Sequence, residues 1–360
     1  MATAHENVTM QRAPTVRFRQ SGVRVRIVMC VLPWPVPTLT LAHSPDPDDA
    51  FMWWPITGMV SPDGSPLPGE VGHPAIDTAG FTFTAVPADI SVLNRRAVER
   101  GDLDITAVSM RTYVDVKSRY MLTSCGASFG DGYGPKVVCR ADSPLRGPCD
   151  LLDPSRRIAI PGRGTTAFLT LGLLLRGERV AEATSSGADL SGDDRFIEMP
   201  FDRVMTAVAR GEADAGIVIH DAQLTFEREG LRLIADLGAW WKSQRGLPLP
   251  LGANVIRRDL DARHGRGTIS RVCAVLEASI RHALAHRDRA LAYAATFAEP
   301  GHAASVADID RFVGMYVNGY TLDLGDTGYQ AVVTLLHEGA LVGLCPEPEV
   351  IDIARPSTLR

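Results

Sequence analysis

The sequence predicts an α/β protein made of two lobes with a ligand cleft between them. Strand-like and helix-like segments alternate along most of the chain, which is typical of mostly parallel sheets covered by helices. One helix–glycine–strand unit occurs twice. The length of 360 residues fits two domains, since a domain usually takes roughly 150 residues.

In the first half of the chain, short apolar runs predict strands and longer runs that end at glycine predict helices. The strands are expected at 38–44, 81–89 and 104–109, and the helices at 48–57 and 91–101. The second half shows the same alternation of strand-like and helix-like segments. There we expect strands at 156–162 and 213–220 and helices at 165–177 and 201–211.

The repeated unit is the strongest sign that the two halves are related. AVERGDLDITAV at 97–108 and AVARGEADAGIV at 207–218 share an Ala-Val-x-Arg-Gly-acid-x-Asp pattern at an offset of 110 residues. In each copy a helix ends at Arg-Gly and a buried strand follows. The glycine suits a left-handed helix cap and the aspartate a turn before the strand. The residues concerned are Gly101 and Gly211, and Asp104 and Asp214.

Composition excludes several classes of protein. Lys and Arg number 37 against 42 Asp and Glu, for a net charge of −5, so nucleic-acid binding is not expected as the main activity. With 45% hydrophobic residues, the chain is not expected to be disordered. The longest apolar stretches are too short for a membrane span. The six cysteines form no Cys-x-x-Cys pair, which favours reduced thiols in a cytoplasmic protein over a zinc site.

Residues 1–37 differ from the rest of the chain. Five arginines precede an apolar stretch, as in an export signal, but three prolines interrupt that stretch and no small-residue cleavage site follows. We therefore expect a disordered leader or a start codon placed too far upstream, with export as the alternative.

Ligands of open α/β sheets bind outside the carboxyl ends of the strands. Four loops should therefore face one cleft, at 43–51, 109–111, 161–166 and 220–223. Two come from each half, so the cleft should lie between the lobes.

The loop PGRGTTAF offers an anion site. Thr165 and Thr166 follow a Gly-x-Gly turn at a helix start, where free N–H groups, hydroxyls and the helix dipole favour a carboxylate. The alternative is that these threonines only cap the helix.

The loop HSPDPDDAF is rich in carboxylates. Calcium-loop spacing fails because Phe51 stands where glycine is required, so no metal is expected. We expect Asp48 and Asp49 to cap the following helix. Whether Asp46 and Asp48 contact substrate stays open, and Ser44 is a candidate ligand contact.

His220 directly follows an apolar strand at the expected cleft, and an imidazole with a pKa near 6.5 suits a general base at neutral pH. Asp221 either orients it or faces solvent. Trp240 and Trp241 either stack on an aromatic ligand or fill the junction between the lobes. His282 and His286, four residues apart on one helix, are expected to serve packing or the surface rather than a metal.

Five segments carry a family resemblance: GRGTTAF, IVIHDAQLTF, DLGAWWKSQRGLPLPLG, ALAHRDRALAY and YVNGYTLDLG. In order and spacing, from residue 38 to about 345, the chain resembles the 1,4-dihydroxy-6-naphthoate synthases of the futalosine route to menaquinone. Many members have Cys and Asn where this chain has Asp46 and Asp48.

The resemblance implies a two-lobed, periplasmic-binding-protein-like fold of type II. Lobe one would comprise 38–140 and 250–350, and lobe two 141–249. It also implies conversion of a small-molecule substrate, cyclic dehypoxanthinyl futalosine, to 1,4-dihydroxy-6-naphthoate without a cofactor. His220 would be the base. The implied substrate contacts are Ala107, Val108, Ser109, Thr165 and Thr166.

Two alternatives stay open. Chorismate dehydratase of the same pathway resembles this fold, but it typically has a Gly-Asp strand end where this chain has His220 and Asp221. A non-catalytic solute-binding protein would require export.

Overall fold

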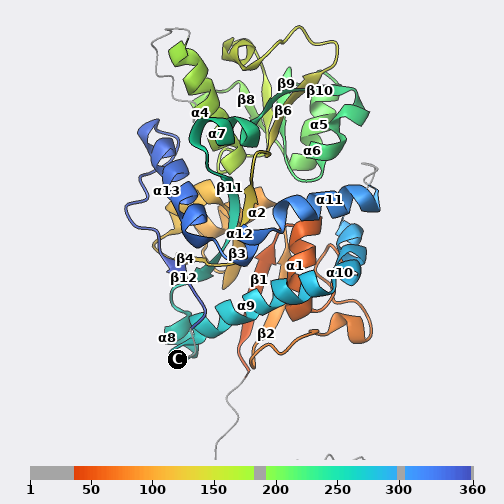
Figure 1. The fold of residues 1–360 in the computed structure, drawn as a ribbon, viewed down its shortest axis with the longest axis vertical. Helices are drawn as coiled ribbons and strands as arrows, with labels where there is room; N and C mark the ends of the chain where they lie inside the picture. The colour runs from red at the N-terminus through yellow and green to blue at the C-terminus, as the bar shows by residue number, and fades with distance from the viewer. Residues whose placement is uncertain (1–35, 182–191, 298–304, 358–360) are drawn as a thin grey trace, which may run out of the picture. The chain divides into compact units, whose positions relative to one another are not determined.

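The computed structural model describes residues 36–181, 192–297 and 305–357. The leader predicted at 1–37 lies almost wholly outside these residues. The described strands form two sheets, and Figure 1 shows them at opposite ends of the drawn fold, with β1 to β4 in the lower half and β6, β8, β9 and β10 in the upper half.

The first sheet has the strand order β12-β4-β11-β3-β1-β2, and β5 pairs with β11 beside this path. Its strands are β1 (Thr38–His43), β2 (Thr82–Pro87), β3 (Ile105–Ser109), β4 (Tyr120–Thr123), β5 (Ser128–Gly130), β11 (Leu249–Arg257) and β12 (Ile353–Ala354). The second sheet has the order β10-β6-β9-β7-β8. Its strands are β6 (Lys136–Arg140), β7 (Ile158–Ile160), β8 (Phe196–Glu198), β9 (Ala215–Val218) and β10 (Leu231–Asp236).

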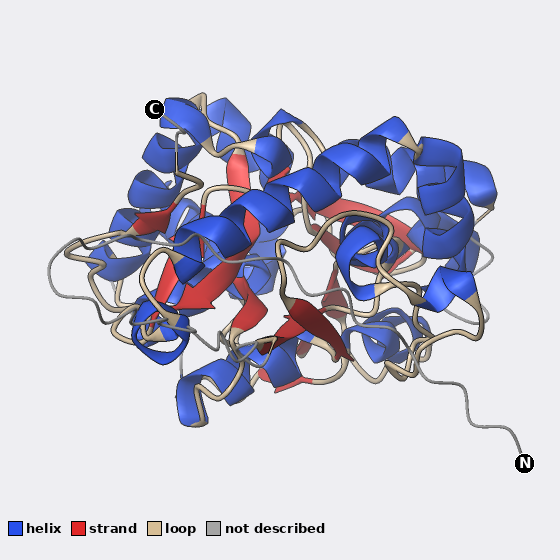
Figure 2. Ribbon diagram, turned by 90° about the horizontal axis from the view of Figure 1, so that it is seen from below, coloured by secondary structure: helices blue, strands red, loops and turns tan. Residues whose placement is uncertain are grey.

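Helices surround both sheets, as Figure 2 shows with strands in red and helices in blue. In the first half they are α1 (Pro47–Thr57), α2 (Ile90–Glu99) and α3 (Met110–Val116). The second sheet carries α4 (Thr166–Ala181), α5 (Phe201–Ala209), α6 (Ala222–Thr225) and α7 (Leu237–Arg245). The C-terminal series is α8 (Leu260–His264), α9 (Thr268–Ala285), α10 (Arg287–Ala294), α11 (Val306–Tyr316), α12 (Gly319–Leu322) and α13 (Gly325–Leu341). None of the helices in the described ranges has the length and apolar composition that a membrane crossing needs.

The strand orders confirm that the two halves are built alike. In the first sheet β1 lies between β2 and β3, parallel to both. In the second sheet β7 lies between β8 and β9, again parallel to both. An antiparallel strand follows on the same side in each case, β11 beside β3 and β6 beside β9.

The repeated glycines and aspartates occupy matching places. Gly101 and Gly211 have φ angles of 60° and 73°, in the left-handed region that suits glycine after a helix. A carboxylate oxygen of Asp104 accepts the N–H of Thr40 at 2.9 Å, and one of Asp214 accepts the N–H of Arg157 at 2.9 Å. Each aspartate, predicted only as a turn residue, thus also ties its strand to the neighbouring segment.

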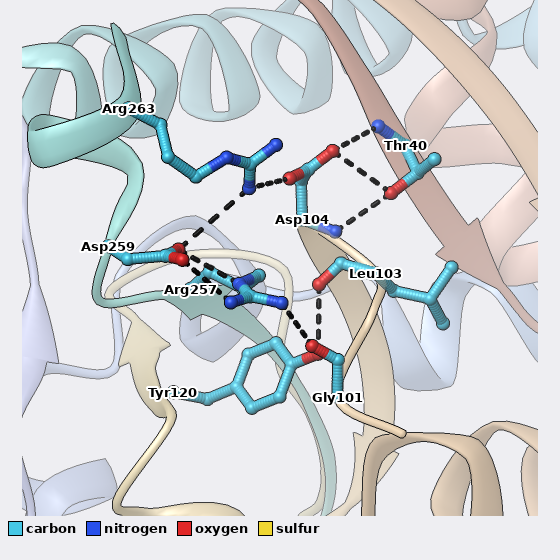
Figure 3. A network of polar contacts seen from close by, with 8 residues as sticks. All are labelled: Thr40, Gly101, Leu103, Asp104, Tyr120, Arg257, Asp259 and Arg263. Carbon is cyan, nitrogen blue, oxygen red and sulfur yellow. Dashed lines mark hydrogen bonds and ion pairs between the residues drawn. The ribbon is translucent and has the colours of Figure 1, made fainter. Parts of the chain in front are cut away.

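In the first half this tie belongs to a larger polar network (Figure 3). Arg263 forms an ion pair with Asp104, whose carboxylate also accepts from Thr40. Arg257 donates to the carbonyl of Gly101. The network links residues at β1, β3 and β11 of the first sheet, and none of the residues drawn lines the cavity described below.

Several predicted boundaries differ from the structure by about two residues or more, and two of them matter here. The helix expected to stop at Gly177 continues to Ala181, since an interior glycine costs a helix only about 1 kcal/mol and does not by itself end it. The strand expected to reach His220 ends at Val218, so His220 lies in the loop beyond.

The chain crosses between the sheets twice. The first crossing lies between β5 and β6, and the second between β10 and β11. Lobe boundaries at 140 and 250 stay a prediction. Because β6 already pairs with β9 in the second sheet, the structure favours a first boundary several residues before 140. The crossings touch at Gly134 and Gly238, where a Cβ on Gly238 would lie 1.9 Å from the carbonyl oxygen of Tyr133.

Candidate functional site

A cavity of about 120 Å³ lies among the loops that follow strands of both sheets. All of the residues predicted to act on substrate line it. They are Ser44, Ala107, Val108, Ser109, Thr165, Thr166 and His220. The structure therefore brings the predicted set together, while the role of each residue stays a prediction.

The end of β3 is held by a side chain that the sequence analysis missed. Asn94 on α2 accepts the N–H of Ser109 at 2.8 Å and donates to its hydroxyl at 2.9 Å. Both residues are buried. This reciprocal pair fixes the direction in which the segment from Ala107 to Ser109 meets the cavity.

The hydroxyls of Thr165 and Thr166 already have protein partners. Thr165 Oγ1 accepts the N–H of Phe168 at 3.2 Å, as a helix cap does. Thr166 Oγ1 donates to the carbonyl of Leu251 at 2.7 Å and accepts the N–H of Arg111 at 3.1 Å. An anion at this place would therefore be held by the N–H groups that a helix start leaves without intrahelical partners.

The first loop differs from the prediction. Asp46, rather than Asp48 or Asp49, caps α1, and it accepts the N–H of Asp49 at 3.3 Å. Asp49 instead accepts the N–H of Ser44 at 2.7 Å and the indole N–H of Trp53 at 3.3 Å. Proline prefers the first position of a helix, so Pro47 makes the preceding residue the cap.

His220 pairs with Asp46, which was not predicted as its partner. The Nδ1 atom of His220 lies 2.7 Å from a carboxylate oxygen of Asp46. The ring of Phe201 packs against the imidazole, with centroids 4.4 Å apart. His220 has a φ angle of 54°, a left-handed conformation that few residues other than glycine adopt. Among the described residues, its Nε2 atom has no hydrogen-bond partner.

Burial disfavours the charged imidazole, but the charge and hydrogen bond of Asp46 outweigh burial and raise the pKa of His220 to about 9. Burial likewise opposes ionisation of Asp46, and His220 reverses this and lowers the pKa of that carboxyl. For Asp49, burial and the charge of Asp46 together raise the pKa to about 8. Burial and both neighbouring carboxylates hold the pKa of Asp48 well above its usual range.

The substitution Asp48→Asn is expected to stabilise the protein more at pH 8 than at pH 5. A carboxyl whose pKa is raised by folding contributes stability that is full below its unfolded pKa of about 4 and is lost as pH rises through the folded value. Asparagine stays neutral and avoids this loss. Thermal melting of both proteins at the two pH values measures the difference, and an equal difference at both would contradict the raised pKa.

Packing bears on two further predictions. Trp241 is fully buried and donates its indole N–H to the carbonyl of Pro248 at 3.1 Å, while Trp240 packs against hydrophobic clusters of both sheets. Neither lines the cavity, which favours filling of the junction over ligand stacking. The rings of His282 and His286 stack at 4.0 Å. Within the described ranges, no group of three His, Cys, Asp or Glu residues could hold a metal ion.

Other lining residues escaped the sequence analysis. Asn254 on β11 is buried and donates to the carbonyl of Gly126 at 2.9 Å. Tyr316 on α11 donates its hydroxyl to Gln223 at 2.9 Å. A buried polar residue within an apolar strand was a usable signal for Asn254. Tyr316 offered none, because its partner is distant in sequence.

This fold defines a class of protein. The alkanesulfonate-binding protein SsuA from Xanthomonas axonopodis pv. citri is similar to it with a TM-score of 0.59 and 14% identity, and the match covers 88% of this chain and 98% of that one. The predicted fold, two-lobed and like that of periplasmic binding proteins, is confirmed.

The chain belongs to the menaquinone biosynthesis family, whose model matches residues 39–340. A protein of Thermus thermophilus named 1,4-dihydroxy-6-naphthoate synthase is 36% identical over 321 residues, which is 88% of this chain and 99% of that protein. The crystal structure of an Archaeoglobus fulgidus protein matches with a TM-score of 0.68 and 34% identity, over 85% of this chain and 98% of that one. These findings confirm the resemblance that the motifs indicated.

Proposed function

We propose that this protein is an enzyme that converts cyclic dehypoxanthinyl futalosine to 1,4-dihydroxy-6-naphthoate, with loss of the sugar-derived fragment. The observation that carries the proposal is a buried imidazole, paired with a carboxylate, in a cavity that also contains a helix start. The similarity to a synthase of that name supports the choice of substrate.

His220 would act as the general base. Removal of a proton next to a ketone needs a strong base at hydrogen-bond distance. Because Asp46 raises the pKa of His220 to about 9, the neutral imidazole is a minor form at pH 7 but a stronger base than free imidazole. Its Nε2 atom has no partner among the described residues, so this atom would take the proton.

The start of α4 would hold the substrate carboxylate. Backbone N–H groups at a helix start and the helix dipole favour an anion there. The cavity is also lined by Ser109 at the end of β3, on the first sheet. A carboxylate fixed at one end would orient the rest of the substrate toward His220.

The test is a product assay. Purified full-length protein is incubated with cyclic dehypoxanthinyl futalosine without added metal or cofactor, and the products are identified by chromatography and mass spectrometry. We expect 1,4-dihydroxy-6-naphthoate to accumulate with repeated turnover. A parallel incubation with chorismate is expected to give no product. Dehydration of chorismate, or tight binding of the naphthoate precursor without turnover, would overturn the proposal.

A further inference from the structure

The ion pair between Asp46 and His220 joins the two halves of the molecule. Asp46 follows β1 of the first sheet, whereas His220 follows β9 of the second, and their side chains meet at 2.7 Å. The carboxylate and the imidazole are therefore supplied by separate sheets, and their distance depends on how closely the facing loops approach.

Other hydrogen bonds join the same two sets of loops. Thr112 on α3 donates its hydroxyl to the carbonyl of Gly164 at 2.8 Å. On another side of the cavity, Tyr316 on α11 donates to Gln223 at 2.9 Å. The cavity of about 120 Å³ is lined from both sheets, so its size depends on how closely these loops approach one another.

We propose that Asp46 is a positioning residue for His220, and that the imidazole becomes a competent base only when the loops of the two sheets are in contact. This inference rests on the proposed role of His220 as the base. Separation of the loops would remove the carboxylate from Nδ1, and closure around a substrate would restore it. Base strength and substrate enclosure would then arise in one step.

The local structure of Asp46 suits a positioning role. Prolines precede and follow it, so its backbone is restricted, and it adopts φ −125° and ψ 165° as expected before a proline. The helix cap that it forms with Asp49 adds a further restraint. A carboxylate held in this way keeps the hydrogen on Nδ1 and directs the basic lone pair to Nε2.

Other charged groups also face the imidazole. After Asp46, the negative charges of Asp221 and Asp89 also raise the pKa of His220. In turn, the charge of His220 partly offsets the effects that raise the pKa of Asp49. Asp46 favours the protonated imidazole most strongly, since it acts on His220 through both its negative charge and a hydrogen bond. Asp89 lies at the start of α2, where it caps the helix through the N–H of Ser91 at 2.6 Å. It therefore offers a matched control, since asparagine also caps helices.

The experiment is a pH titration of the His220 imidazole by NMR in the full-length protein, with its signal assigned by loss in His220→Asn. In the wild type we expect a pKa of about 9, against the ordinary value near 6.5. Asp46→Asn keeps the helix cap and the shape of the side chain but removes its charge, so the pKa should fall to 6.5 or below. Asp89→Asn should leave it within about half a unit of the wild type. Asp46→Ser, which also caps helices, serves as a second variant.

The closure part is tested in Thr112→Val/Tyr316→Phe, which loses two of the hydrogen bonds between elements of the two sheets. The variant keeps Asp46 and the bonds of Thr166 to Leu251 and Arg111. We expect the pKa of His220 to fall between those of the wild type and Asp46→Asn. An unchanged value overturns the dependence on closure, and an unchanged value in both Asp46 variants overturns the positioning role. These readouts need no substrate. A high pKa of His220 in a protein that forms no naphthoate would instead refute the proposed function.

Discussion

Replacement of His220 by asparagine is expected to lower kcat by about 10²- to 10⁴-fold, which is the usual contribution of a positioned general base. Asparagine tolerates the left-handed backbone that His220 adopts at φ 54°, so the loop should keep its conformation. It is also small and polar and cannot take up a proton. Steady-state kinetics measure kcat, and equilibrium binding of the substrate should change little, since the helix start of α4 is untouched.

The matched control is His286→Asn, because His286 is exposed and stacks on His282 outside the cavity. Its kcat should stay within about twofold of the wild type, as expected for surface substitutions away from the site. Full activity in His220→Asn would show that His220 is not the base, whatever product the enzyme forms.

The substitution Gly238→Ala is expected to destabilise the fold by about 3 kcal/mol or more, at the upper end of what overpacking causes. The added Cβ would lie 1.9 Å from the carbonyl oxygen of Tyr133 and 2.5 Å from the N atom of Gly134. These are backbone atoms of the other crossing segment, so no side-chain rotation can relieve the clash. Urea unfolding followed by circular dichroism measures the loss, and failure to express soluble protein is the extreme form of the same result.

Gly246→Ala provides the comparison for Gly238. Gly246 ends α7 with φ 69°, and a Cβ there meets no atom within 4 Å. Only left-handed strain should appear, at roughly 1–2 kcal/mol. Equal losses in the two variants would show that close approach of the two crossing segments is not what requires glycine at 238.

Local patterns predicted part of the fold. Apolar runs and glycine stops located β1, β2, β3, β7 and β9, since these signals depend on neighbouring residues, whereas the other described strands were not predicted. The duplicated Arg-Gly-acid-x-Asp unit indicated that the two halves are related, and the matching strand orders agree with this. The error at Gly177 has a simple cause, because a single glycine costs a helix little and is a weak stop.

The candidate site was less predictable. The strand-end rule placed Ser44, Ser109, Thr165, Thr166 and His220 at the cleft, and the resemblance added Ala107 and Val108; the structure finds all seven around one cavity. The partner of His220 was missed because Asp221 is adjacent in sequence, whereas Asp46 approaches only through the fold. The pKa values of Asp48 and Asp49 are raised because both carboxyls are buried beside other carboxylates. No sequence pattern shows how completely a loop is buried.

The internal repeat has a consequence for where the two halves diverge. Continued past the aligned segments at the same offset, it sets Met110, directly after β3, against His220, two residues after β9. Met110 begins α3 and is buried in an apolar cluster, whereas His220 lies in a loop with a φ angle of 54° and pairs with Asp46. The likeness of the two halves therefore stops at the ends of these strands, and the ionisable side chain stands just beyond that point in only one of them.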